Sequence, residues 1–261
     1  MRCRTLMSGS SGNAVYFESE KTRLLIDAGK SGIQISTALS NYCQIQGSQL
    51  DALLVTHAHM DHIAGIGVLS RRFKLPVYAT EGAWLEMTPI IGLIPPHLKY
   101  VFKANDHLSI GDLVIETFET AHDASESIGC VVTDAKSRIG LLTDTGVFTD
   151  QMALLMFKLD GIIIEANHDI NLLRKSRYPE FLKKRILGSE GHLSNDDAAK
   201  ILISIICDRT TQIILAHLSE ENNTKELALE AVNQILPELA KNSKFSLSVA
   251  PRHEASPWIL V

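Results

Sequence analysis

Four side chains of the kinds that bind metal ions fall within one stretch of six residues. They belong to the segment Thr56-His57-Ala58-His59-Met60-Asp61-His62. Imidazole and carboxylate groups suit Zn²⁺, Mn²⁺ or Fe²⁺, and four of them this close together could serve two adjacent ions. A single loop histidine is more often solvated or hydrogen-bonded than a ligand, but four such residues after an apolar strand are hard to explain in that way. The segment therefore predicts a metal centre.

The elements on either side of this segment would display its side chains. Residues 52–56 are continuously apolar up to Thr56, which indicates a buried strand, and apolar spacing predicts a helix over 63–72. Functional side chains are commonly displayed in loops at strand ends. His57 and His59 would share one direction if the backbone is still extended there, and Asp61 and His62 would project from the start of the helix.

Four residues do not complete two metal sites, so the rest of the chain should supply more ligands. His122, Asp144 and His217 each follow a predicted strand, over residues 113–120, 139–143 and 211–216 respectively. Each alone could be a cap, a turn residue or a core-edge side chain. Their shared position at strand ends, together with the first cluster, predicts one common rim.

Short β-branched runs alternate with amphipathic segments along the chain, and no low-complexity linker or fixed repeat divides it. The expected strands lie at residues 14–18, 22–27, 52–56, 76–80, 113–120, 128–133, 139–143, 161–165, 211–216 and 244–249. The expected helices lie at residues 63–72, 195–206 and 224–236. We expect one α/β domain over 1–261, in which two β-rich sheets are covered by helices.

Composition and charge exclude several classes of protein. The chain has 261 residues, 45% of them hydrophobic and 21% charged, which excludes disordered and fibrous proteins. A net charge of −5 argues against non-specific coating of nucleic acid. No apolar leader follows the charged start and no apolar run is long enough to span a membrane. The four cysteines are widely spaced, as is typical of reduced thiols, so we expect a cytoplasmic protein.

The histidine segment, followed in order by His122, Asp144 and His217, resembles the metallo-β-lactamase superfamily over nearly the whole chain. More narrowly, residues 8–13, 165–169, 191–195 and 215–223 resemble the YycJ/WalJ/VicX branch of that superfamily. The resemblance implies a four-layer αββα sandwich with metal ions in a cleft at one edge. It also implies an association with exonuclease activity on DNA.

The resemblance implies a ligand set as well. His57, His59 and His122 would hold a first metal ion, Asp61, His62 and His217 a second, and Asp144 would bridge the two. The expected cofactors are two divalent ions, zinc or manganese rather than iron. Two such cations make hydroxide available at neutral pH, and this nucleophile attacks phosphorus or a carbonyl carbon. Asp61 could also orient the nucleophile, which makes it a catalytic candidate.

Two further histidines are not needed for that ligand set. His192 lies just before a predicted helix, where backbone N–H groups favour anions, and we expect it to contact the scissile phosphate or to protonate the leaving oxygen. Ser194 or Asn195 would support it, and either could cap the helix. His168 could be a substrate contact, a partner of a metal ligand or a structural residue.

A basic segment lies between these two histidines. Residues 174–185 include six basic residues and one acidic residue, a net charge of +5 within an acidic chain. Such a segment could guide a phosphate backbone toward the metals, with Lys183 and Lys184 as contacts. A solvated helix face is the other explanation for a short basic run.

The preferred function is a metal-dependent phosphodiesterase, a nuclease that digests DNA from an end. The alternative is a small-molecule hydrolase, such as a glyoxalase II-like thioesterase or a cyclic phosphodiesterase. A weaker reading is an iron-dependent oxidoreductase or sensor. We expect DNA as the partner and no membrane contact, and the sequence gives no indication about protein partners.

Overall fold

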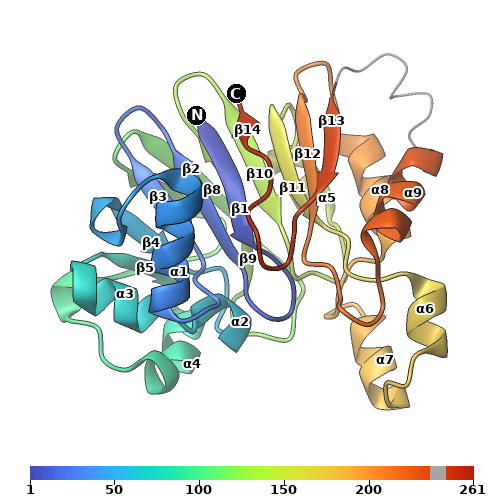
Figure 1. Cartoon of the computed structure of the whole chain (residues 1–261), viewed down its shortest axis with the longest axis horizontal. Helices are drawn as coiled ribbons and strands as arrows, with labels where there is room; N and C mark the ends of the chain where they lie inside the picture. The colour runs from blue at the N-terminus through green and yellow to red at the C-terminus, as the bar shows by residue number, and fades with distance from the viewer. Residues whose placement is uncertain (236–244) are drawn as a thin grey trace.

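Two seven-stranded sheets form the centre of the protein in the computed structural model, which describes residues 1–235 and 245–261 (Figure 1). The first sheet has the order β14 (Ile259–Leu260), β1 (Arg2–Met7), β2 (Ala14–Glu18), β3 (Arg23–Ile26), β4 (Ala52–Leu54), β5 (Val77–Thr80) and β6 (Lys99–Phe102). The second has the order β13 (Ser246–Val249), β12 (Gln212–Ala216), β11 (Gly161–Glu165), β10 (Arg138–Leu142), β9 (Ile128–Thr133), β8 (Leu113–Glu119) and β7 (His107–Ile110).

Helices cover the outer faces of both sheets (Figure 1). On the first sheet they are α1 (Gly32–Ala38), α3 (Ile66–Phe73) and α4 (Glu81–Ile91), and on the second α5 (Asp150–Leu155), α8 (Asn195–Ile205) and α9 (Lys225–Ile235). The short helices α2 (Met60–Ile63), α6 (Ile170–Lys175) and α7 (Glu180–Ile186) lie toward the lower edge in Figure 1. Within the described ranges, no helix has both the length and the apolar composition needed to cross a membrane.

Three apolar layers hold the sandwich together. Successive strand residues point to opposite faces, so Leu24 and Ile26 of β3 pack between the sheets while Leu25 packs beneath the helices of the first sheet. In the second sheet, Ile163 of β11 faces the layer between the sheets and Ile162 faces α5 and α8. Strands buried on both faces explain the continuously apolar runs in the sequence. This arrangement confirms the predicted αββα sandwich.

The strand directions bring one set of strand ends to a single edge. Strands β10, β11, β12 and β13 are mutually parallel, so their carboxyl ends lie together. The first sheet contributes β4, which is parallel to both of its neighbours. At this edge the N–H of Ile128 donates to the carbonyl of Thr56 at 3.1 Å, which joins β9 to the segment after β4.

The structure differs from the sequence-based expectation in several elements. The helix expected over 63–72 is two helices, α2 and α3, which are separated at Gly65. The N–H of Gly65 donates to the carbonyl of Ala28 at 2.7 Å, and a Cβ there would lie 2.5 Å from the carbonyl oxygen of Lys30. Strand β1 was not predicted. The final residue of the helix expected at 224–236 and the first of the strand expected at 244–249 lie outside the described residues.

Candidate metal centre and active-site cleft

Three of the predicted ligands meet where β4 and β8 end. His57 follows β4, His59 precedes the first turn of α2, and His122 follows β8. Their potential ligand atoms lie within 4.8 Å of one another, and His122 Nε2 is 3.3 Å from His59 Nδ1. Burial and neighbouring imidazoles keep the pKa of His57 well below its usual value. The ring is therefore neutral, and its buried Nε2 has no hydrogen-bond partner, which suits a metal ligand.

Asp61, His62 and His217 form a second cluster with the same compactness. Asp61 and His62 belong to α2, and His217 follows β12 with a positive φ of 56°. The Oδ2 atom of Asp61 is 3.6 Å from His217 Nε2 and 3.7 Å from His62 Nε2. The structure thus brings together one carboxylate and two imidazoles, as predicted.

Asp144 lies between the two clusters. Its Oδ2 is 3.4 Å from His62 Nε2, and its Oδ1 is 3.8 Å from His122 Nε2 and 3.4 Å from His217 Nδ1. The side chain is buried, and Oδ2 has no hydrogen-bond partner. A buried carboxylate costs free energy unless a cation or donors compensate it. Divalent cations held by these histidine and aspartate groups would do so, and the donor set suits zinc or manganese.

Asp27, which the sequence reasoning did not select, orients His62. Its Oδ2 accepts a hydrogen bond of 2.8 Å from His62 Nδ1 and another of 2.8 Å from the Thr56 hydroxyl. Burial lowers the pKa of His62, but the carboxylates of Asp27 and Asp144 outweigh this and raise it to about 9. With Nδ1 held by Asp27, the Nε2 atom of His62 faces the carboxylates of Asp61 and Asp144. The available signal was the position of Asp27 after an apolar run, at the same edge as His57.

Asp27→Asn is expected to weaken metal binding about 10- to 100-fold, because one amide oxygen cannot replace both carboxylate oxygens around Thr56 and His62. Competition against a chromophoric chelator measures this. Asp51→Asn is the matched control, since Asp51 accepts the N–H of Arg23 at the opposite end of β3 and β4. Equal metal affinities of Asp27→Asn and the wild type would contradict the orienting role.

Glu165 connects one predicted ligand to another cleft residue. It is fully buried at the end of β11, and its Oε1 accepts from His217 Nδ1 at 2.7 Å and from His192 Nδ1 at 2.8 Å. Burial would raise the pKa of Glu165, but the two histidines outweigh burial and lower it, so the side chain is a carboxylate. The sequence reasoning gave Glu165 no role of its own, although the residue ends a buried strand at the ligand edge.

His192 lies in a cleft of about 230 Å³ beside the two clusters. The cleft is lined by Ser10, His59, Asp61, His122, Asp144, Asn167, Tyr178, Leu182, Arg185, Ile186, His192, His217 and Ser219. His192 Nδ1 is occupied by Glu165 and lies 3.7 Å from Asp144 Oδ1. The other ring nitrogen, Nε2, therefore remains for a substrate.

Other candidates lie outside the cleft lining. Ser194 caps α8 by accepting the N–H of Asp197, and Asn195 exchanges two hydrogen bonds with Asn223. Both are buried, and neither lines the cleft.

The two lysines of the basic segment also lie outside the lining. Lys183 Nζ donates to the carbonyl of Arg174 and pairs with Glu180, and Lys184 lies on the exposed surface of α7. The basic residue that lines the cleft is Arg185, which is paired with Asp123. Sequence reasoning placed Arg185 within the basic segment but did not select it.

His168 is buried away from the cleft lining, and neither of its ring nitrogens has a hydrogen-bond partner. Burial lowers its pKa to about 4. As the pH falls, this imidazole is protonated near pH 6.5 in the unfolded chain but only near pH 4 in the folded chain. Acidification therefore favours unfolding. We expect His168 to act as a structural residue and not as a substrate contact.

Between pH 7 and pH 4, the free energy of unfolding is expected to fall by about 3 kcal/mol less in His168→Leu than in the wild type, because the variant has no imidazole to protonate. Denaturant unfolding at the two pH values, with chelator present, measures the difference. His97→Leu, at an exposed position, is the control and should keep the wild-type loss. An unchanged pH dependence in His168→Leu would contradict the lowered pKa.

Comparison with known proteins agrees with this geometry. Residues 22–218 match the family model described as a beta-lactamase superfamily domain, and the chain therefore belongs to that superfamily. The chain is 42% identical to exodeoxyribonuclease YycJ of Bacillus anthracis, over 89% of this chain and 88% of the relative. It is 44% identical to exodeoxyribonuclease WalJ of Streptococcus pneumoniae, over 88% and 86%. These similarities confirm the predicted YycJ/WalJ-like branch.

Solved structures show the same fold at low sequence identity. The metallo-beta-lactamase fold protein YhfI of Bacillus subtilis matches with a TM-score of 0.73 and 17% identity, over 98% of this chain and 99% of that one. Human tRNase Z, short form, matches with a TM-score of 0.67 and 18% identity, over 98% and 99%. At these identities the comparison establishes the fold alone.

Proposed function

We propose that residues 1–261 form a two-metal phosphodiesterase that removes nucleotides from the end of a DNA strand. The observation that carries this proposal is the pair of ligand clusters on either side of Asp144, beside a cleft that holds the Glu165–His192 pair. The similarity to two proteins named exodeoxyribonucleases supports DNA as the substrate. Bound in the clusters, two zinc or manganese ions would acidify the attacking water and stabilise negative charge on the phosphoryl oxygens.

The protein's own side chains orient the attacking water and protonate the leaving oxygen. Burial would raise the pKa of Asp61, but hydrogen bonding to His217 and the nearby histidine charges lower it, so its carboxylate can accept a hydrogen bond from the attacking water and orient it. His192 carries a proton on Nε2 to the leaving oxygen. Glu165 holds His192 Nδ1 and stabilises the ring while it is protonated.

The cleft wall supplies groups that suit a nucleic-acid strand. Arg185 and Tyr178 line the cleft from α7 and from the segment before it. A guanidinium binds phosphate oxygens in a bidentate manner, and an aromatic ring offers a stacking surface to a base. The basic segment 174–185 thus contributes Arg185 at the cleft, with its lysines farther out.

We also propose that the protein works in the cytoplasm. All four cysteines are free, and burial raises the pKa of Cys3 and Cys130 and raises that of Cys43 to about 12. Buried, protonated thiols without disulfides are typical of a reducing compartment.

Hydrolysis of end-labelled duplex and single-stranded DNA with Mn²⁺ or Zn²⁺ tests the proposed activity. Bis(p-nitrophenyl) phosphate and a glutathione thioester are assayed in parallel. We expect mononucleotides to be released from one end of the DNA, and we expect chelation to stop their release. Cleavage of the thioester alone would contradict the proposal and favour a glyoxalase II-like thioesterase.

A further inference from the structure

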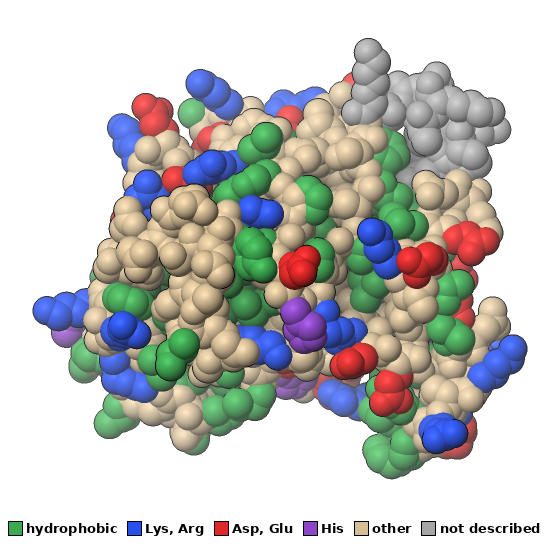
Figure 2. Space-filling model, in the orientation of Figure 1, with side chains coloured by type: hydrophobic (Ala, Val, Ile, Leu, Met, Phe, Trp, Pro, Cys, Tyr) green, Lys and Arg blue, Asp and Glu red, His purple; other side chains and the backbone are tan. Residues whose placement is uncertain are grey.

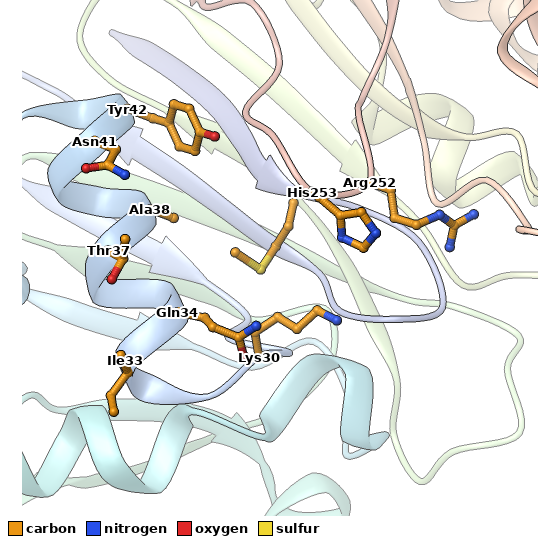
Figure 3. Close-up of a pocket in the computed structure, with 10 residues that line it drawn as sticks. Lys30, Ile33, Gln34, Thr37, Ala38, Asn41, Tyr42, Arg252 and His253 are labelled. Carbon is orange, nitrogen blue, oxygen red and sulfur yellow. The ribbon is translucent and has the colours of Figure 1, made fainter.

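A second pocket, of about 260 Å³, lies between α1 and the segment that connects β13 to β14 (Figure 3). Its lining includes Lys30, Gln34, Asn41, Tyr42, Arg252 and His253. None of these residues belongs to the metal clusters or lines the cleft. The face of the molecule shown in Figure 2 carries a His side chain near its centre, with Lys and Arg side chains and an acidic side chain close to it.

The charge of this pocket suits an anion. Lys30, Arg252 and His253 line it, and its lining contains no acidic residue. In the part of the chain that the structure describes, Lys30 makes no side-chain hydrogen bond or ion pair. Arg252 Nη1 has no hydrogen-bond partner, but its guanidinium pairs with Glu220 at 3.6 Å and donates from Nη2 to the carbonyl of Leu218 at 3.2 Å. Figure 3 shows this guanidinium pointing away from α1. The Lys30 ammonium is therefore the charged donor that a phosphate would meet in this pocket, with the His253 ring beside it.

The wall formed by α1 and the turn after it suits a flat group with hydrogen-bonding edges. Gln34 and Asn41 offer amide groups from α1 and the turn after it, and Tyr42 offers an aromatic ring (Figure 3). Met7 and Ala38 add apolar surface beside them. A positive end next to an aromatic and amide-lined end matches a phosphate that carries a sugar and a base.

One loop separates this pocket from the metal clusters. On the pocket side, a Cβ at Gly12 would lie 2.8 Å from Lys30 Cγ, and a Cβ at Gly9 would lie 3.2 Å from Arg252 Nη1. On the other side, Asn13 Nδ2 lies 3.2 Å from Asp61 Oδ2 and 3.0 Å from His62 Nε2. Ser10 of the same loop lines the cleft. The loop that contains Ser10 therefore borders both the cleft and the pocket.

We infer that this pocket is a nucleotide subsite for the DNA strand, beyond the phosphate that is cleaved. The inference rests on the proposed function and names where the uncleaved part of the substrate lies. A phosphate binds to Lys30 and His253, and the base of that nucleotide packs against Tyr42 and is held by the amides of α1 and the turn after it. The loop around Ser10 sets the spacing between the subsite and the cleaved bond.

Lys30→Gln tests the phosphate part in metal-free protein, by fluorescence anisotropy with a labelled single-stranded decamer. We expect the Kd to rise about five- to tenfold, because one charged hydrogen bond is lost. We also expect the slope of log K against log salt to shrink by about 0.7, the value for one phosphate contact on a single strand. Lys136→Gln is the control, since Lys136 is exposed in the turn before β10, at the opposite end of that strand from Asp144.

Tyr42→Leu tests the base part with a normal decamer and an abasic one. We expect it to weaken binding of the normal strand by about fivefold more than binding of the abasic strand, because base stacking is lost. Equal weakening of both strands would reduce the pocket to a phosphate site and overturn the nucleotide assignment.

Kinetics separate the subsite from the proposed function. With metal present, the KM of Lys30→Gln should rise more for the decamer than for bis(p-nitrophenyl) phosphate, which is too small to reach the pocket. If Lys30→Gln raised the KM equally for both substrates, or bound the decamer as tightly as the wild type does, the subsite would be overturned. The proposed nuclease activity would not be affected by either result. A wild-type protein that neither binds nor cleaves the decamer would overturn both.

Discussion

Asp144→Asn is expected to lower kcat on DNA by about a thousandfold, which corresponds to the several kcal/mol that two correctly held cations supply. The Asp144 carboxylate lies within 4 Å of His122 in the first cluster and of His62 and His217 in the second. The amide has no charge and offers one good acceptor, so it cannot serve both clusters equally. Single-turnover kinetics together with metal analysis of the purified variant measure the loss.

Asp160→Asn provides the matched control for this substitution. Asp160 precedes β11 and accepts from the N–H of Arg138 at the far end of β10, and it also pairs with Arg209. This variant should bind two ions and keep its turnover, even if its stability falls. A variant Asp144→Asn that bound two ions and kept wild-type turnover would show that the carboxylate does not bridge the clusters.

His192→Ala is expected to lower kcat on DNA by about 100- to 10,000-fold, the usual range for loss of a general acid. The loss should be much smaller for bis(p-nitrophenyl) phosphate, because nitrophenolate leaves without needing a proton. Metal content should stay at the wild-type level, since His192 is outside the predicted ligand set. Comparison of the two substrates under saturating metal makes the measurement.

Glu165→Gln tests the carboxylate that holds the His192 ring. The glutamine keeps the shape but removes the charge that holds both His192 and His217. We expect it to depress turnover of DNA and also to weaken metal binding. If His192→Ala reduced the turnover of both substrates by the same factor, His192 would be a binding residue and not the proton donor.

The sequence could predict that the candidate ligands lie close together, because strand ends carry most of them. His57, His122, Asp144 and His217 each follow an apolar run, and these runs are buried strands whose carboxyl ends share one edge. A single helical turn then adds Asp61 and His62. Sequence order and hydrophobic pattern were therefore enough to place these side chains on one rim.

Other parts of the site depend on tertiary contacts that leave no local pattern. Asp27 and Glu165 resemble ordinary residues at the ends of strands, and only the fold shows that they hold histidine rings. In the basic segment, periodicity could not tell which basic residue of the short helix α7 lines the cleft, and the structure places Arg185 there. The break at Gly65 likewise depends on the backbone of Ala28, which is distant in sequence.

The seven candidate metal ligands come from both halves of the sandwich. His57, His59, Asp61 and His62 come from the first sheet's side, and His122, Asp144 and His217 come from the second. Each ion would thus act as a cross-link between the two sheets, and at 100 times its Kd one ion adds about 2.7 kcal/mol to the free energy of unfolding. When metal is scarce, such a protein would lose both stability and catalytic activity. Metal supply in the cell would then set how long each molecule survives proteolysis, as well as how fast it works.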